Sequence, residues 1–140
     1  MPPILFYFVV LSFLAGFGIE ILCDIRDREE DVLSHVNTLP VITSEKCCAL
    51  ITSAIFGCII ILDPLPFFWD IDAGLYRNYI FLFLIIIPVA TFAVMIFSLS
   101  KNAGPDNAGR WITYARPAML AGCLAYVLGV VFQDQFICFL

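Results

Sequence analysis

The sequence predicts an all-α fold, a polytopic bundle of about four transmembrane helices that forms a single domain over residues 1–140. Composition is the first reason, because 62% of the residues are hydrophobic and only 14% are charged. A soluble domain is about half apolar and about a quarter charged. The second reason is that the charges are clustered, since four long stretches contain none of them.

The four charge-free stretches define the predicted spans in order along the chain. A helix needs about 20 apolar residues to cross a bilayer, within a range of about 17–25. The first and third stretches are long enough by themselves, whereas the second and fourth must include flanking residues. The charge-free stretches are Met1–Ile19, Cys47–Leu62, Asn78–Ser100 and Pro117–Gln133. The predicted spans are 3–23, 44–63, 78–99 and 113–133.

Two other interpretations of the apolar stretches are less favoured. A signal peptide would have a basic beginning and an apolar run of about 7–15 residues, but residues 1–23 lack the first and exceed the second. Buried helices of a soluble protein would need amphipathic helices to cover them, and four such stretches in 140 residues leave almost none. An integral, multi-pass membrane protein is therefore expected.

Basic residues predict the orientation of the bundle. The first and third connections, about 24–46 and 100–112, lie on the same side of the membrane by alternation. Together with Arg116 they hold six of the seven Lys and Arg residues, which concentrate on the cytoplasmic side of membrane proteins. These connections are therefore expected on the cytoplasmic or equivalent inner side. No basic run suited to nucleic acid is present.

The second connection is expected at the opposite interface. Pro64 and Pro66 end the second helix, and an aromatic belt follows, made of Phe67, Phe68, Trp69 and Tyr76. The acidic residues of this connection are interpreted as a solvated loop in preference to a metal site; they are Asp63, Asp70 and Asp72. The six cysteines are interpreted as apolar packing residues, because no CxxC motif and no Cys–His spacing occurs.

The chemically distinctive segment is a set of carboxylates that we name the acidic stripe: Glu20, Asp24, Asp27 and Asp31. Their spacing of i, i+4, i+7 and i+11 places them on one face of a helix that continues out of the first span. Glu20 lies inside the apolar span, where an acidic residue is costly and by default functional. Mg²⁺ binds through one or two carboxylates plus substrate phosphates. The stripe therefore suggests a Mg²⁺–diphosphate site, with a solvated juxtamembrane helix as the alternative.

The stripe and the residues after it carry a resemblance. The run Asp24-x-x-Asp27-x-x-x-Asp31, followed by Asn37-Thr-Leu-Pro-Val41, resembles the second aspartate-rich motif of the UbiA superfamily of intramembrane prenyltransferases. The similarity is close over Gly18–Ile42, and elsewhere only the number of spans matches. It implies that the four spans correspond to helices six to nine of the nine-helix UbiA fold.

The resemblance also implies an activity. Members of the superfamily transfer an isoprenoid from a prenyl diphosphate to a lipophilic or aromatic acceptor within the membrane lipid, with Mg²⁺ as cofactor. By motif position, the implied catalytic and metal-binding residues are Asp24, Asp27 and Asp31, and Glu20 is added to the metal ligands from its spacing alone. The candidates for contact with the diphosphate are Arg26, Arg28 and Lys46.

The first aspartate-rich motif of the superfamily, of NDxxDxxxD type, is not found before Gly18. We therefore expect the chain to correspond to the carboxyl-terminal half of such an enzyme, with an amino-terminal half as its partner, and to be inactive alone. A non-catalytic four-helix membrane protein or a degenerate paralogue is the alternative. A transporter is less favoured, since its carboxylates would lie nearer the bilayer midplane. His35 is interpreted as a loop residue in preference to a general base. Tyr114 and Tyr126 are interpreted as packing residues in preference to residues that line a cavity.

Overall fold

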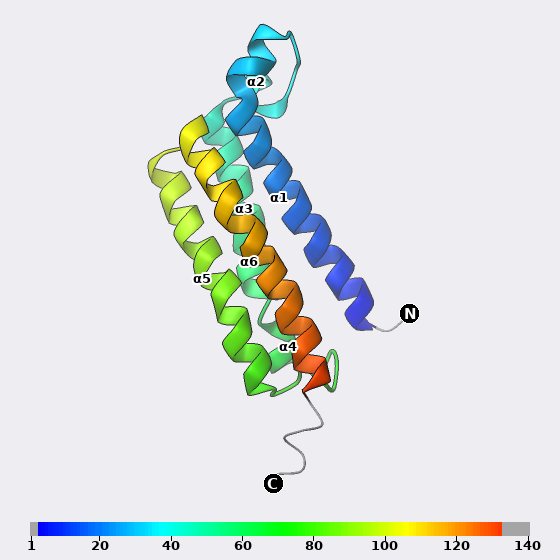
Figure 1. The fold of residues 1–140 in the computed structure, drawn as a ribbon. Coiled ribbons are helices and arrows are strands. Elements are labelled where there is room, and N and C mark those ends of the chain that lie inside the picture. Colours follow the sequence, from blue (N-terminus) through cyan, green and yellow to red (C-terminus); the bar gives the residue numbers. More distant parts are fainter. Residues whose placement is uncertain (1–2, 133–140) are drawn as a thin grey trace.

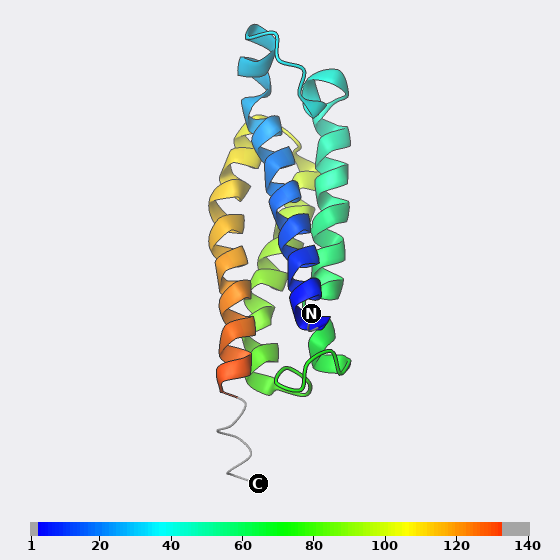
Figure 2. The ribbon, with the colours of Figure 1, turned by 90° about the vertical axis from the view of Figure 1, so that its right-hand side faces the viewer.

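The computed structural model describes residues 3–132, which form a bundle of antiparallel helices. The helices are α1 (Pro3–Leu33), α2 (Leu39–Ile42), α3 (Glu45–Leu62), α4 (Leu65–Phe68), α5 (Tyr79–Lys101) and α6 (Pro105–Val131). Between residues 3 and 132 no β-strand occurs. Figures 1 and 2 show α1, α3, α5 and α6 running side by side along one axis. The predicted all-α fold is confirmed.

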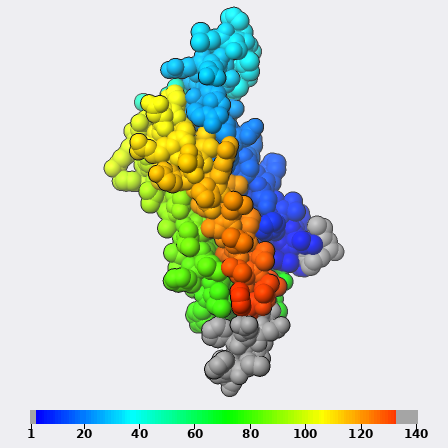
Figure 3. All heavy atoms as spheres, in the orientation of Figure 1, coloured from blue at the N-terminus to red at the C-terminus, as the bar shows by residue number. Residues whose placement is uncertain are grey.

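The four long helices are each long and apolar enough to cross a membrane, as the sequence predicted. Helix α1 has 31 residues, which corresponds to roughly 46 Å of helix, whereas the hydrocarbon core of a bilayer is about 30 Å thick. Its last third, from Asp24 onward, therefore extends beyond the apolar layer. Figure 3 shows this end of α1 and the segment after it projecting past the rest of the bundle.

The long helices form a ring in which each packs against two neighbours. Helix α1 packs against α3 and α6, and α5 packs against the same two helices from the other side. Phe56 of α3 and Phe92 of α5 meet at the centre, with their ring centroids 4.8 Å apart. Gly18 of α1 lies directly against Phe56, because a Cβ atom at Gly18 would be 2.6 Å from that ring. A small residue at this position lets the helices approach closely.

Polar side chains define where two of the long helices begin. Ser44 caps α3 by accepting a hydrogen bond from the backbone N–H of Cys47 at 3.2 Å. Asn78 caps α5 by accepting from the backbone N–H groups of Ile80 and Phe81. The amide nitrogen of Asn78 also donates to the carbonyl of Gly129 at 2.8 Å, which ties the start of α5 to the end of α6.

The connections alternate between the two ends of the bundle, as predicted. Residues 34–44 and 102–104 lie at one end, and residues 63–78 lie at the other (Figure 1). In the latter connection the side chains of Phe68, Trp69 and Tyr76 are exposed, which suits an aromatic belt at an interface. The five cysteines within the described range are free thiols, and Cys138 lies outside it.

Candidate functional site at the end of helix α1

The acidic stripe lies where α1 leaves the apolar layer. Glu20 is exposed, and Asp24, Asp27 and Asp31 are half-buried. Burial raises the pKa of the Asp24 carboxyl, and the carboxylates of Asp31, Glu20 and Asp27 raise it further. The four groups therefore share one electrostatic environment, and the helix predicted to continue through Asp31 does so. Like charges gathered in this way favour binding of a cation.

Asp27 is engaged by the neighbouring arginine. The Nε and Nη2 atoms of Arg26 donate to the two carboxylate oxygens of Asp27, each at 2.6 Å. The hydrogen bond from Arg26 lowers the pKa of Asp27, so this carboxyl keeps its charge at lower pH than Asp24. Both side chains remain about two-fifths exposed. The Nη1 atom of Arg26 is not used in this contact, so it is the donor that remains for a diphosphate, as the sequence suggests.

Arg28 contacts the segment that follows α1. Its Nε donates to the carbonyl of Pro40 at 3.1 Å, and its Nη1 lies 3.3 Å from a carboxylate oxygen of Glu45. Arg28 therefore links α1 to α2 and to the start of α3. Lys46, the third residue proposed for the diphosphate, is exposed in the first turn of α3.

Asp31 is held in place by a residue of the segment Thr38–Val41. The hydroxyl of Thr38 donates to the Asp31 carboxylate at 2.8 Å, and the backbone N–H of Val36 donates to the Asp31 carbonyl at 2.9 Å. The chain reverses at His35, which has a left-handed φ of 56° and an exposed side chain. His35 is therefore a loop residue, as predicted. The role of Thr38 was not predicted. The sequence does show a hydroxyl residue close to the stripe, in the segment Thr38–Val41, and this could have indicated a hydrogen bond to one of the aspartates.

The donor set of the stripe suits a hard cation, but it does not form a closed metal site by itself. Within residues 3–132, no three His, Cys, Asp or Glu side chains gather closely enough to hold a metal ion. Carboxylate oxygens are the ligands that Mg²⁺ prefers, and Mg²⁺ takes only one or two of them when substrate phosphates and waters supply the rest. The stripe therefore fits a Mg²⁺ ion whose remaining ligands come from outside the stripe.

The face of α1 that carries the stripe continues as an aromatic surface. Phe13 and Phe17 are exposed and their rings are stacked at 6.1 Å. With Glu20 and Asp24 they follow the spacing i, i+4, i+7 and i+11, which places all four on one face. An exposed carboxylate within an apolar span is costly against lipid. This face of α1 is therefore suited to line a space filled by protein or ligand.

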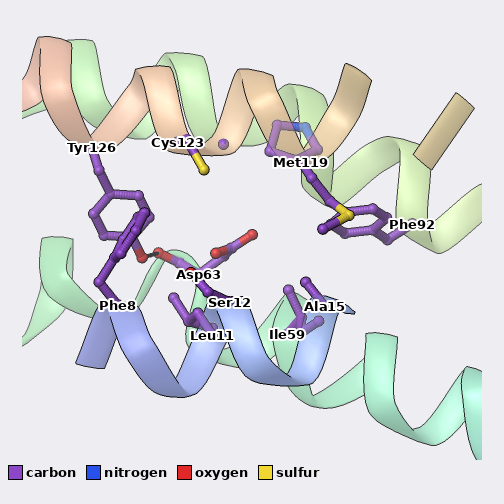
Figure 4. Close-up of a pocket in the computed structure, with 12 residues that line it drawn as sticks. Phe8, Leu11, Ser12, Ala15, Ile59, Asp63, Phe92, Met119, Cys123 and Tyr126 are labelled. Carbon is purple, nitrogen blue, oxygen red and sulfur yellow. Dashed lines mark hydrogen bonds between the residues drawn. The ribbon is translucent and has the colours of Figure 1, made fainter. Parts of the chain in front are cut away.

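A second feature lies inside the bundle, towards the opposite end. A cavity of about 110 Å³ is bounded by residues of all four long helices (Figure 4). Asp63 lines this cavity and is only 6% exposed, so its interpretation as part of a solvated loop was wrong. Asp70 is exposed, and Asp72 accepts a hydrogen bond from the backbone of Gly74.

The two tyrosines that the sequence singled out have different surroundings. Tyr126 is buried, lines the same cavity and donates its hydroxyl to the carbonyl of Asp63 at 2.9 Å. It therefore both packs and lines a cavity, whereas the sequence favoured packing over a cavity-lining role. Tyr114 is exposed and its ring lies beside that of Trp111.

The chain is similar to three proteins that are each named digeranylgeranylglyceryl phosphate synthase. Identity is 24% over 136 residues with the protein of Hyperthermus butylicus, 29% over 122 residues with that of Methanopyrus kandleri, and 26% over 127 residues with that of Pyrococcus abyssi. These matches include 94%, 87% and 89% of this chain but only 44%, 42% and 42% of the relatives. The chain thus spans less than half the length of the relatives. No protein-family model and no solved structure matches the chain.

These relatives are UbiA-type prenyltransferases. The resemblance that the aspartate motif carried is thereby confirmed, and the similarity extends over most of the chain beyond Gly18–Ile42. Four helices able to span a membrane agree with an integral, multi-pass membrane protein.

Proposed function

We propose that this chain acts as the carboxyl-terminal half of a UbiA-type prenyltransferase, which transfers an isoprenoid group from its diphosphate to a lipophilic acceptor. One observation carries the proposal. Four carboxylates share one electrostatic environment on one face of α1, in a chain that is similar to prenyltransferases over most of its length.

The proposed roles follow from the chemistry of the side chains. Asp24, Asp27 and Asp31, with Glu20 beside them, would offer the one or two carboxylate ligands that Mg²⁺ takes when phosphates and waters supply the rest. When bound, Mg²⁺ neutralises the negative charge of the diphosphate leaving group. Arg26 offers its Nη1 atom to the diphosphate, and Lys46 is free to approach it from α3. Arg28 fixes the position of α2 and α3 against α1, and it is the third candidate for contact with the diphosphate.

The aromatic surface below the stripe suits the apolar part of the substrate. An isoprenoid chain whose diphosphate lies at Asp24 and Asp27 would extend towards the middle of the bilayer, along the face that carries Phe17 and Phe13. Both rings are exposed there. The names of the relatives describe a product with geranylgeranyl groups on glyceryl phosphate, so a glyceryl phosphate lipid is the proposed acceptor.

The proposed partner is an amino-terminal half that supplies the remaining ligands. The stripe needs donors beyond its own carboxylates, because no closed three-ligand cluster occurs within residues 3–132. The relatives are more than twice as long as the segment that they share with this chain. Separate helical fragments associate in a bilayer through packing and hydrogen bonds.

The test is prenyl transfer by complementation. Membranes containing this chain, the amino-terminal part of the Methanopyrus kandleri synthase, or both together are supplied with radiolabelled prenyl diphosphate, a glyceryl phosphate lipid and Mg²⁺. Transfer is expected only when both parts are present. Asp24→Ala, Asp27→Ala and Asp31→Ala should each lower it by on the order of 100-fold, as loss of a group that stabilises transition-state charge does.

Glu29→Ala is the matched control, because Glu29 lies on the same turn of α1 but off the stripe and is exposed. It should leave transfer nearly unchanged. Equal activity of the Asp27 and Glu29 variants would remove the case for a ligand stripe. Robust transfer by this chain alone would contradict its proposed role as one half of the enzyme.

A non-catalytic four-helix membrane protein is the second candidate. The lack of a closed three-ligand cluster in the described range favours it. Its signature would be stable association with the amino-terminal part, measured by co-purification, without any prenyl transfer.

A further inference from the structure

Asp63 is a buried carboxylate that the proposed reaction does not use. It follows the last residue of α3, and Figure 4 shows its carboxylate directed into the cavity between the long helices. Over residues 3–132 its hydrogen bonds are made by backbone atoms alone, and its carboxylate has no bonded partner. Ser12, which also lines the cavity, precedes Asp24 on α1 by about 18 Å of helix. The cavity is therefore separate from the stripe.

The negative charge around this cavity favours the binding of a cation. The carboxyl-terminal end of a helix carries a partial negative charge from its final carbonyls, and Asp63 caps that end of α3. The hydroxyl of Tyr7 donates to the backbone carbonyl of Leu62, and that of Tyr126 donates to the backbone carbonyl of Asp63. Neither tyrosine donates to the Asp63 carboxylate. The carboxylate itself is left without a donor, and burying an ionised carboxylate without a partner is strongly unfavourable.

The walls of the cavity indicate which kind of cation fits. Phe8, Phe92 and Tyr126 contribute aromatic rings, and Leu11 and Ile59 contribute aliphatic side chains. A metal cation requires several oxygen ligands, but most of this lining is apolar. Aromatic rings attract organic cations through their faces, and an apolar pocket with one fixed polar group is typical of a site for a small organic molecule.

We infer that the cavity is a binding site for an organic ammonium group, with the Asp63 carboxylate as its anionic partner. Two sources could supply this chemistry, a small free amine or the ammonium of an ethanolamine lipid headgroup. Ser12 of α1 and Cys123 of α6 line the cavity and are exposed, so the cavity opens between these two helices. The proposed prenyl transfer plays no part in this inference.

The first experiment measures binding of ethylammonium to the purified chain in maltoside micelles by saturation-transfer NMR. Wild type should bind the probe saturably, and ethanol, which is similar in size and uncharged, should not compete. Asp63→Asn should weaken binding by at least about tenfold, the effect expected for loss of a charge-assisted hydrogen bond. Asp70→Asn removes the same charge from an exposed residue of the same connection and should leave binding unchanged.

Phe92→Leu keeps the carboxylate but removes an aromatic face, and should weaken ethylammonium binding by a smaller factor of about two- to fivefold. This variant decides the matter if circular dichroism shows that Asp63→Asn loses helix. Equal affinity of wild type and a folded Asp63→Asn, or of wild type and Phe92→Leu where Asp63→Asn does not fold, would overturn the inference. The inference would also be overturned if the chain bound neither ethylammonium nor the lipid saturably.

Native mass spectrometry then identifies the source. The chain is mixed with phosphatidylethanolamine or phosphatidylglycerol before the micelle is removed. Retention of phosphatidylethanolamine alone, with displacement by ethylammonium and loss in Asp63→Asn, would identify the lipid headgroup. Equal retention of both lipids alongside ethylammonium binding would identify a free amine.

Discussion

Asp24 and Asp27 differ in how tightly they hold a proton. The pKa of Asp24 is raised by burial and by the carboxylates of Asp31, Glu20 and Asp27, whereas hydrogen bonding to Arg26 lowers the pKa of Asp27. As the pH falls, Asp24 is therefore protonated before Asp27. A divalent cation competes with these protons, so its binding should weaken first at Asp24.

This difference predicts the pH dependence of divalent-cation binding. Mn²⁺ binding to the purified chain in nanodiscs, in the presence of inorganic diphosphate, is followed by electron paramagnetic resonance as the pH is lowered from about 7 to about 4. Asp24→Asn should weaken binding and shift the loss of binding to lower pH. Glu30→Gln, at an exposed residue off the stripe, should not shift it. An unchanged midpoint in Asp24→Asn would contradict the assignment.

Thr38 is expected to position Asp31. Thr38→Val removes the hydroxyl that donates to the Asp31 carboxylate at 2.8 Å while keeping the shape of the side chain. Mn²⁺ affinity should fall by about two- to tenfold, the usual net effect of one hydrogen bond, and Thr38→Ser should restore it. Thr43→Val is the control, because the Thr43 hydroxyl donates to the carbonyl of Leu39. If Thr38→Val and Thr43→Val weaken binding equally, the hydroxyl of Thr38 has no specific effect on the site.

Sequence spacing predicted that the stripe shares one face, because helix geometry alone determines that relation. It did not predict the partners of Arg28 or the burial of Asp63. Arg28 contacts residues 12 and 17 positions away, which requires the turn after α1. Asp63 directly precedes Pro64, a position typical of a loop, but it is buried in the bundle. Tyr126, 63 positions away, donates a hydrogen bond to its carbonyl.

At the scale of the helices, Gly18 is expected to determine how closely α1 approaches α3. A Cβ atom there would lie 2.6 Å from the ring of Phe56, which is fully buried against Phe92 and cannot move easily. Gly18→Ala should therefore lower the free energy of unfolding by about 1–3 kcal/mol, the usual cost of overpacking. Thermal or detergent-induced unfolding of the purified chain, followed by circular dichroism, measures the change.

Gly16→Ala supplies a matched control on the same helix. A Cβ atom at Gly16 would meet no other atom within 4 Å, so only the helix propensity changes. Alanine favours a helix by up to about 1 kcal/mol over glycine, and Gly16→Ala should leave stability unchanged or raise it. Destabilisation of similar size by both substitutions would show that contact with Phe56 does not limit the approach of α1.

Hydropathy predicted the helices that cross the membrane but not all of their ends. The fourth span was predicted from residue 113, whereas α6 begins at Pro105. Its first turns contain Asp106 and Arg110, which a search for apolar stretches leaves out. Proline is favoured in the first turn because the N–H that it lacks would be unpaired there. The single-turn helices α2 and α4 are too short for any periodic pattern to reveal.

At the scale of the whole molecule, alternation along the chain predicted which connections share an end, and the structure confirms it. It did not predict that α1 packs between α3 and α6, because lipid-facing and buried positions are both apolar in a membrane protein. Interior positions are distinguished by shape instead, because a small residue there lies against a larger one. The examples are Gly18 against Phe56 and Gly122 against Pro88.

The arrangement predicts a topology in the membrane that labelling can test. His35 and Asn107 lie in or beside the connections at one end of the bundle, and Tyr76 lies in the connection at the other. Six of the seven basic residues belong to the first end or its adjoining turns, which favours the cytoplasmic side.

In a cysteine-free background, His35→Cys and Asn107→Cys should react with a membrane-impermeant thiol reagent only from the inner side. Tyr76→Cys should react only from the outer side. Reaction of the first two from opposite sides would contradict four spans, whereas reaction of all three from the reversed sides would preserve the bundle and move the acidic stripe to the outer surface.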